Sequence, residues 1–125
     1  MIILSLEQVK NLHKKLLIGT GGLNGIRDEA LLDSALVDAF QTFDGAELYP
    51  STAAKIARIT YGLVCNHPFI DGNKRIGMYV MLVLLELNHI DAAFTNEDII
   101  RIGLEIAQGK MGDKRLLSEI LEHSQ

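Results

Sequence analysis

The sequence predicts an all-α protein, with one small hairpin as the only expected exception. Three observations lead to this prediction. Apolar residues recur at helical spacings of three and four along most of the chain. Only two prolines interrupt it, and no segment alternates apolar and polar residues as a half-buried strand requires. With 125 residues, 48% of them hydrophobic, the chain suits one compact domain over residues 1–125.

The first half of the chain contains two helices and an irregular segment. Ser5–Gln8 has the form of a capping box, so we expect a helix to begin there. The glycine-rich stretch 19–25 ends this helix and forms a flexible loop. A second helix is expected to begin near Asp28. Residues 42–50 are expected to form an irregular segment, with a short hairpin or flap around Asp44-Gly45.

The remaining chain predicts four further helices. Ser51 or Thr52 can cap the first of them, which must end before Pro68 because the residue preceding a proline is pushed out of the helical region. Arg75–Leu87 is apolar almost all round, so we expect it to be buried on most sides as the central helix of a bundle. Asn96 and Asp113 are expected to cap the last two helices.

Charge and cysteine content exclude several classes of function. Twelve Lys and Arg against sixteen Asp and Glu give a formal net charge of −4, so there is no overall basic field to attract nucleic acid or an anionic membrane. The single cysteine, Cys65, cannot form an internal disulfide. Met1–Ser5 is too short for a signal peptide and lacks its positive start. We therefore expect a cytoplasmic protein with neither a membrane nor a nucleic acid as partner.

One stretch of ten residues differs from the rest of the chain. Between two apolar helices, Asn66–Arg75 contains a titratable base, a carboxylate, a glycine, a carboxamide and two cations. Gly72 permits a tight backbone turn, and Asn73 is a good N-cap for the next helix. The amide groups at the start of that helix, together with Lys74 and Arg75, form a phosphate-binding end.

Three further side chains complete this loop. The carboxylate of Asp71 lies at the turn, where it can hold Mg²⁺ against bound phosphates. His67 carries an imidazole, which is suited to taking a proton from an attacking hydroxyl at neutral pH. Phe69 anchors the loop by burying its ring in the core. The alternative is an ordinary polar loop with a chance helix cap, which the number of coincident residue types disfavours.

Residues 67–75, His-Pro-Phe-Ile-Asp-Gly-Asn-Lys-Arg, resemble the signature of the Fic/Doc family, His-x-Phe-x-Asp/Glu-Gly/Ala-Asn-x-Arg. Gly21–Asp28 and Leu32–Ala35 also resemble Doc ("death on curing") proteins, so the resemblance covers nearly the whole chain. It implies a compact Fic-type helical bundle that uses a nucleoside triphosphate and Mg²⁺ to modify a protein hydroxyl. The Fic flap that aligns a target peptide precedes the motif helix, and residues 42–50 occupy that place.

The resemblance also assigns roles to individual residues. The catalytic residues are His67 as general base, Asp71, Lys74 and Arg75. The residues that bind ATP are Gly72, Asn73, Lys74 and Arg75. The residue associated with Mg²⁺ is Asp71.

Two positions separate the branches of the family. Typical Fic enzymes, which transfer a nucleotidyl group, have glycine at the position of Lys74 and a second arginine where this chain has Met78. Both departures match the Doc branch. That branch implies a kinase toxin that transfers the γ-phosphoryl group of ATP to elongation factor Tu and arrests translation, and that an antitoxin protein blocks. A Fic-like AMP or nucleotidyl transferase, and a catalytically silent binding partner with the same fold, are the alternatives.

Several other residues are interpreted structurally. His13 lies on the apolar face of the first helix and is expected to be a partly buried structural histidine. Cys65 is expected to be a small buried hydrophobe rather than a nucleophile. Helix capping and an ion pair account for Arg27 and Asp28. Ser118–Glu122 has the spacing of the inhibitory helix of some Fic proteins, Ser/Thr-x-x-x-Glu-Gly/Asn, but a histidine follows, so a chance match is favoured.

Overall fold

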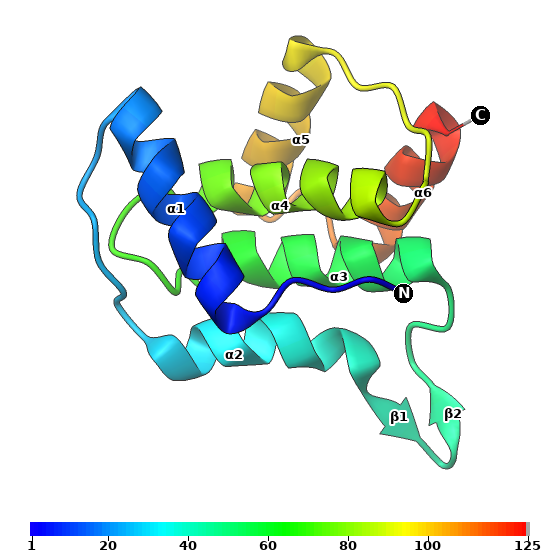
Figure 1. Ribbon diagram of the computed structural model, residues 1–125. Helices are drawn as coiled ribbons and strands as arrows, with labels where there is room; N and C mark the ends of the chain where they lie inside the picture. The colour runs from blue at the N-terminus through cyan, green and yellow to red at the C-terminus, as the bar shows by residue number, and fades with distance from the viewer. Residues whose placement is uncertain (125) are drawn as a thin grey trace.

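A computed structural model describes residues 1–124, and over these residues the chain forms six α-helices, one 3₁₀ helix and one two-stranded hairpin (Figure 1). The helices are α1 (Leu6–Thr20), α2 (Glu29–Val37), η1 (Asp38–Phe40), α3 (Thr52–Cys65), α4 (Asn73–Leu87), α5 (Asn96–Ala107) and α6 (Asp113–His123). The antiparallel strands are β1 (Thr42–Phe43) and β2 (Ala46–Glu47). The predicted all-α class with one small hairpin is confirmed. No helix within residues 1–124 has both the length and the apolar character needed to cross a membrane.

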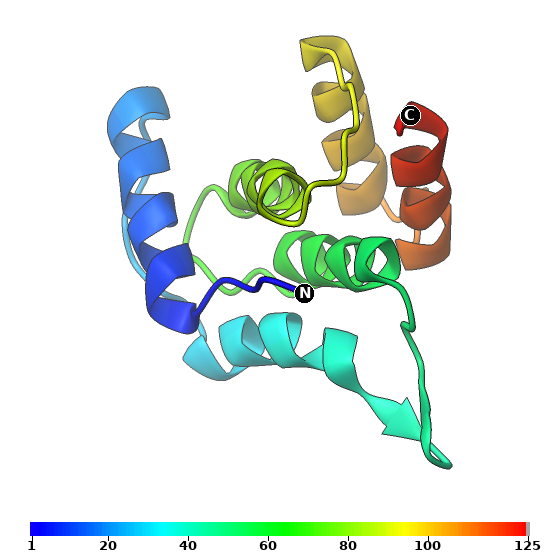
Figure 2. The same cartoon turned by 45° about the vertical axis from the view of Figure 1, so that its right-hand side comes forward.

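Helix α3 is the centre of the bundle, rather than the segment Arg75–Leu87 that the sequence favours for this position. Figures 1 and 2 show α3 beside α4, and α3 also contacts α2 on one side and α6 on another. Helix α4 lies between α1 and α5, and its Tyr79 and Leu82 remain 40% and 37% exposed. Small residues in α3 explain the difference. An added Cβ at Gly62 would lie 3.1 Å from Ala35, so only glycine lets α2 approach this closely.

Polar residues start three helices as predicted. The Ser5 hydroxyl accepts a hydrogen bond from the Gln8 amide at 3.2 Å, within a complete capping box. Asp28 caps α2 and Ser51 caps α3 in the same manner, at 3.1 Å and 3.0 Å. These contacts place the first turn of each helix where the sequence indicates.

The predicted caps of the last two helices are wrong by one residue. Asn96 and Asp113 are each the first residue of their helix. Thr95 caps α5 because its hydroxyl accepts from the amide of Asp98, and Gly112 precedes α6 without a side-chain cap. Neighbouring polar residues compete for a cap position, and the one with extended backbone geometry takes it.

The hairpin turns at Asp44 and Gly45, whose φ angles are +52° and +79°, as the predicted turn requires. It packs on the first turn of α3, where the Lys55 ammonium lies 3.0 Å from the Glu47 carboxylate. Helix α3 has 14 residues and separates the hairpin from the α3–α4 loop by about 20 Å (Figure 1). The short hairpin expected within residues 42–50 is confirmed, and it lies at the other end of α3 from this loop.

Candidate active site

The α3–α4 loop and the first turn of α4 bring the predicted site residues together at one end of the bundle (Figure 1). A cavity of about 360 Å³ opens there. Its lining includes His67, Asp71, Gly72, Asn73, Lys74 and Arg75. Every residue that the resemblance assigns to catalysis, ATP or Mg²⁺ thus contributes to the lining of one cavity.

The backbone of His67 has an unusual conformation. Its φ angle is +50°, in the left-handed region that costs a residue with a Cβ on the order of 1 kcal/mol. Such a conformation persists only where neighbouring contacts hold it. The Arg27 side chain supplies two of them, because its Nε donates to the His67 carbonyl at 2.6 Å and its Nη2 donates to the Asn66 carbonyl at 2.8 Å. The His67 side chain itself is exposed beside the cavity.

Asn73 closes the loop rather than capping α4, so this predicted cap is also wrong. Its carboxamide oxygen accepts from the Phe69 amide at 2.9 Å, and its nitrogen donates to the Phe69 carbonyl at 3.0 Å. The N-cap of α4 is Gly72, with φ +79° and no side-chain cap. Because no side chain of residues 1–124 caps this helix start, its amide groups remain available to an anion.

Phe69 and His13 form the buried side of the loop. Both residues are 1% exposed, as predicted for a ring anchor and a structural histidine. The His13 Nε2 lies 2.7 Å from the Asp71 carbonyl oxygen. Since a carbonyl only accepts, Nε2 carries the hydrogen. His13 therefore holds the loop from α1, a contact that its place on the apolar face did not reveal.

The carboxylate of Asp71 is held by two backbone amides. Gly72 donates to Oδ1 at 2.8 Å and Leu23 donates to Oδ2 at 3.2 Å. These hydrogen bonds hold the pKa of Asp71 below its ordinary value, and the Arg75 guanidinium, 3.7 Å away, adds to the effect. Asp71 is therefore a partly exposed, ionised carboxylate at neutral pH.

A single carboxylate fits the mode in which Mg²⁺ accompanies phosphates. Within residues 1–124, no group of three His, Cys, Asp or Glu side chains is placed to hold a metal by itself. Mg²⁺ in phosphoryl-transfer sites is commonly bound through one or two carboxylates together with the phosphates of the substrate. The ionised Asp71, beside a helix start that can receive phosphate, matches this arrangement.

The two cations differ in their surroundings. The Arg75 Nη1 donates to the Gly21 carbonyl at 3.0 Å and to the Thr20 hydroxyl, so its guanidinium also ties α4 to the end of α1. Lys74 is exposed, and its stem lies against α5, where an added Cβ at Gly103 would come within 3.0 Å of the Lys74 Cγ. Lys74 thus presents a solvent-facing ammonium group beside the cavity.

The glycine-rich segment is not merely a flexible connection, because it lies along the site loop. Ile26 and Phe69 form an antiparallel β-bridge, and the Ile70 amide donates to the Gly25 carbonyl at 3.1 Å. An added Cβ at Gly22 would lie 2.8 Å from the Asp71 Oδ2. The run of glycines could have indicated this contact from the sequence, because glycine is required where two backbones approach closely.

Arg27 and Asp28 form part of the same contact. Asp28 caps α2, as predicted, but the expected ion pair of Arg27 is replaced by the two carbonyl contacts described above. The amides of both residues donate to the Pro68 carbonyl, at 2.8 Å and 3.0 Å. Residues separated by about forty positions thus form one structural unit.

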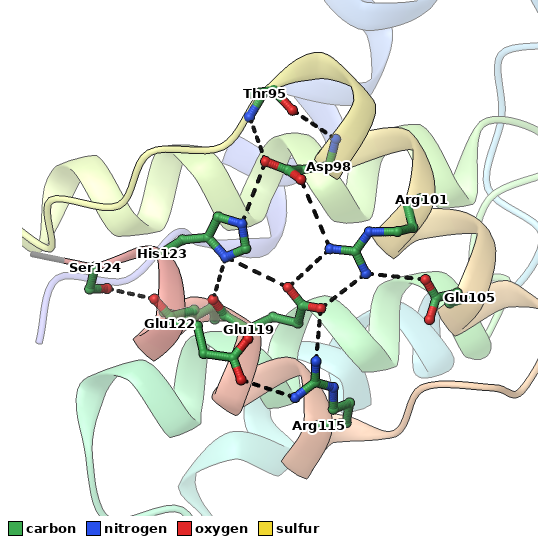
Figure 3. A network of polar contacts seen from close by, with 10 residues as sticks. Thr95, Asp98, Arg101, Glu105, Arg115, Glu119, Glu122, His123 and Ser124 are labelled. Atoms are coloured by element: carbon green, nitrogen blue, oxygen red, sulfur yellow. Dashed lines mark hydrogen bonds and ion pairs between the residues drawn. The ribbon is translucent and has the colours of Figure 1, made fainter.

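Cys65 and Ser118–Glu122 keep their structural interpretation. Burial raises the pKa of the Cys65 thiol, which disfavours the nucleophilic thiolate. Glu122 pairs with Arg115 at 3.2 Å, and the carboxylate that is buried on α6 belongs to Glu119 (Figure 3). Among the described residues that line the cavity, none comes from α6. The spacing match to the inhibitory helix therefore has no counterpart at the site.

The fold and the site define a helical bundle in which the α3–α4 loop and the start of α4 gather an imidazole, a carboxylate and two cations around one cavity. The family model for the Fic/DOC family matches residues 3–85, more than half of the chain, and the protein belongs to this family. It is also 34% identical over 76 residues to the protein "Toxin Doc" of Mycolicibacterium smegmatis (strain ATCC 700084 / mc(2)155). That match covers 61% of this chain and spans 58% of the length of the relative.

Proposed function

We propose that the protein is the toxin of a toxin–antitoxin pair and that it transfers the γ-phosphoryl group of ATP to a hydroxyl of a target protein. The convergence of a base, an ionised carboxylate, an uncapped helix start and two cations on one cavity carries this proposal. The similarity to a protein named Toxin Doc supports the toxin role. By resemblance the target is elongation factor Tu, so the proposed result is arrested translation in the cytoplasm.

Phosphoryl transfer rather than nucleotidyl transfer is favoured by two residues. Lys74 stands where typical Fic enzymes have glycine, and Met78 stands where they have a second arginine. Met78 is 3% exposed, so this position supplies no charge to the cavity. Lys74 instead adds a flexible point charge beside the helix start.

The proposed reaction divides the work among the loop residues. The α4 amides, Lys74 and Arg75 bind and orient the phosphates. Asp71 is the residue that would hold Mg²⁺, which when bound neutralises charge on phosphate oxygens. As the target hydroxyl oxygen bonds to the γ-phosphorus, His67 accepts its proton, the bond to the bridging oxygen breaks, and ADP leaves.

Labelled ATP tests this proposal against the nucleotidyl alternative. The protein is incubated with a cell lysate and with ATP labelled at either the α- or the γ-phosphate. We expect protein-bound label from the γ position only, and the His67→Ala variant should reduce its rate by about two to four orders of magnitude. Label from the α position only would support the Fic-like nucleotidyl transferase and reject the kinase.

Growth measurements test the alternative that the protein is a catalytically silent binding partner. Expression of the wild-type protein is expected to arrest growth, whereas expression of His67→Ala is not. Arrest of equal strength by both proteins would assign the toxicity to binding. Immunoblots of the two proteins provide the control, since equal amounts are needed for the comparison.

The proposed partner is an antitoxin protein that covers an apolar groove beside the site. The groove, about 520 Å³, runs between α1, α4 and α5, and Lys74 and Arg75 line it as well as the cavity. A segment that fills this groove would also restrict access to the two cations. Co-expression with the product of a neighbouring reading frame should restore growth.

A further inference from the structure

Arg27 contacts the site loop where the chain leaves α3. Its guanidinium donates from Nε to the His67 carbonyl at 2.6 Å and from Nη2 to the Asn66 carbonyl at 2.8 Å. A planar guanidinium that engages two consecutive carbonyls sets the orientation of both peptide groups, because its donors are fixed relative to one another. A single flexible ammonium group has no such geometry.

The backbone of the same segment contacts the next residues of the loop. The Arg27 amide donates to the Pro68 carbonyl at 2.8 Å, and the Ile70 amide donates to the Gly25 carbonyl at 3.1 Å. The side chain and backbone of one short segment therefore hold the loop from residue 66 to residue 70. Of these contacts, only those of the Arg27 guanidinium depend on a side chain.

The imidazole of His67 depends on the backbone that carries it. Within residues 1–124 the imidazole forms no hydrogen bond, so the position and direction of its Cα–Cβ bond, which the backbone sets, limit where it can reach. That backbone stands at φ +50°, a conformation that persists only when surrounding contacts hold it. A shift of about 1 Å in a catalytic group lowers a rate by as much as about a hundredfold.

We propose that Arg27 is a positioning residue that holds the backbone of His67 in its left-handed conformation and thereby aims the imidazole at the attacking hydroxyl. This inference rests on the proposed function, in which His67 is the base. Arg27 itself is exposed on the segment before α2 and has no assigned part in binding ATP. Its replacement therefore changes the direction of the base without removing a ligand of the phosphates.

The test compares Arg27→Gln, Arg27→Lys and the control Lys15→Gln, which removes an exposed cation from α1. In the γ-phosphoryl transfer assay, Arg27→Gln should lower kcat about 10- to 100-fold and leave the KM for ATP within about twofold. Arg27→Lys should recover part of kcat, because an ammonium group reaches one carbonyl at a time. Lys15→Gln should match the wild type.

Hydrogen exchange at the bonded amides of Asn66, Phe69 and Ile70 supplies a readout that does not depend on activity. We expect these amides to exchange faster in Arg27→Gln than in the wild type or in Lys15→Gln. The melting temperatures of the three proteins should be similar. Unchanged exchange in Arg27→Gln would overturn the proposal. An unchanged kcat despite faster exchange would also overturn it, as would a raised KM for ATP with a normal kcat. If the wild type transfers no label, the proposed function fails, and exchange still decides whether Arg27 holds the loop.

Discussion

His13 on α1 and Phe69 in the α3–α4 loop stack face to face, with ring centroids 3.8 Å apart and ring planes within 11° of parallel. The same histidine donates from Nε2 to the Asp71 carbonyl at 2.7 Å. One side chain therefore supports both the apolar anchor of the loop and the residue expected to accompany Mg²⁺. Replacements at such a position affect the fold and the site together.

The His13→Leu variant should lower the free energy of unfolding by about 1–3 kcal/mol, because it leaves the Asp71 carbonyl without its buried donor. Urea denaturation measures the change. The control is Lys14→Ala, at an exposed position on the same helix, which should stay within about 0.5 kcal/mol of the wild type. Equal stability of the two variants would contradict a structural role for the His13 contact.

Acid should destabilise the protein partly through Glu119. This carboxylate is 2% exposed and accepts two hydrogen bonds from Arg101, at 3.0 Å and 3.1 Å, and one from Arg115 at 3.2 Å (Figure 3). These contacts, chiefly those of Arg101, hold the pKa of Glu119 below its ordinary value of 4.5. The stabilisation is therefore present above pH 4.5 and is lost as the pH falls through the lowered pKa.

The Glu119→Gln variant isolates this effect. At pH 7 it should be about 2 kcal/mol less stable than the wild type, a value reduced from that of a fully buried pair because both arginines are partly exposed. The difference should narrow between pH 5 and pH 3 in urea titrations. Glu122→Gln, which removes an exposed partner of Arg115, is the control and should show little change at either pH. A stability difference between Glu119→Gln and the wild type that does not depend on pH would refute the stabilising role of the ionised Glu119.

Gly22 and Gly21 offer a matched pair of substitutions. Both have positive φ, +121° and +80°, but an added Cβ would meet the Asp71 Oδ2 at 2.8 Å from Gly22 and nothing within 4 Å from Gly21. Gly22→Ala should therefore be at least about 1 kcal/mol less stable than Gly21→Ala, since only the former adds a clash to the backbone strain. Thermal unfolding measures the difference, and similar melting temperatures would argue against close contact at Asp71.

Leu82 tests the groove proposed for the antitoxin. It is 37% exposed on α4 and lines the groove, without contributing to the site cavity. Leu82→Arg should weaken antitoxin binding at least about tenfold and leave γ-phosphoryl transfer near the wild-type rate. Leu121→Arg, at an exposed position on α6, is the control. Calorimetric titration with the purified antitoxin measures the affinity of each variant. Equal affinities of Leu82→Arg and Leu121→Arg would place the interface elsewhere.

The sequence alone was sufficient for the helical class and for the caps of two of the six α-helices. Helix periodicity and capping depend on residues three or four positions apart, so Ser5 and Asp28 could be assigned without a structure, whereas the choice of Ser51 over Thr52 required it. Where two polar residues compete, as at Thr95 and Asn96, the outcome depends on backbone geometry. The predicted cap was then wrong by one residue.

The central helix and the position of the hairpin required the tertiary structure. Hydropathy favours Arg75–Leu87 as the most buried segment, but close packing depends on small residues. Gly62 lets α2 approach α3, and an added Cβ at Gly77 would meet Val64 at 2.6 Å, so glycine also allows α3 and α4 to pack closely. The hairpin at 42–50 lies next to α3 in sequence, yet the length of that helix carries it away from the site.

The candidate site divides in the same way. His67, Asp71 and Lys74 could be found from the sequence because the loop residues are contiguous. Their types and their order form the motif that identifies the site. The sequence did not reveal that Arg27 and His13 contact this loop, because those contacts cross 40 and 58 residues of chain. Only the folded chain brings such distant residues together, and it is they that determine where the base and the carboxylate lie.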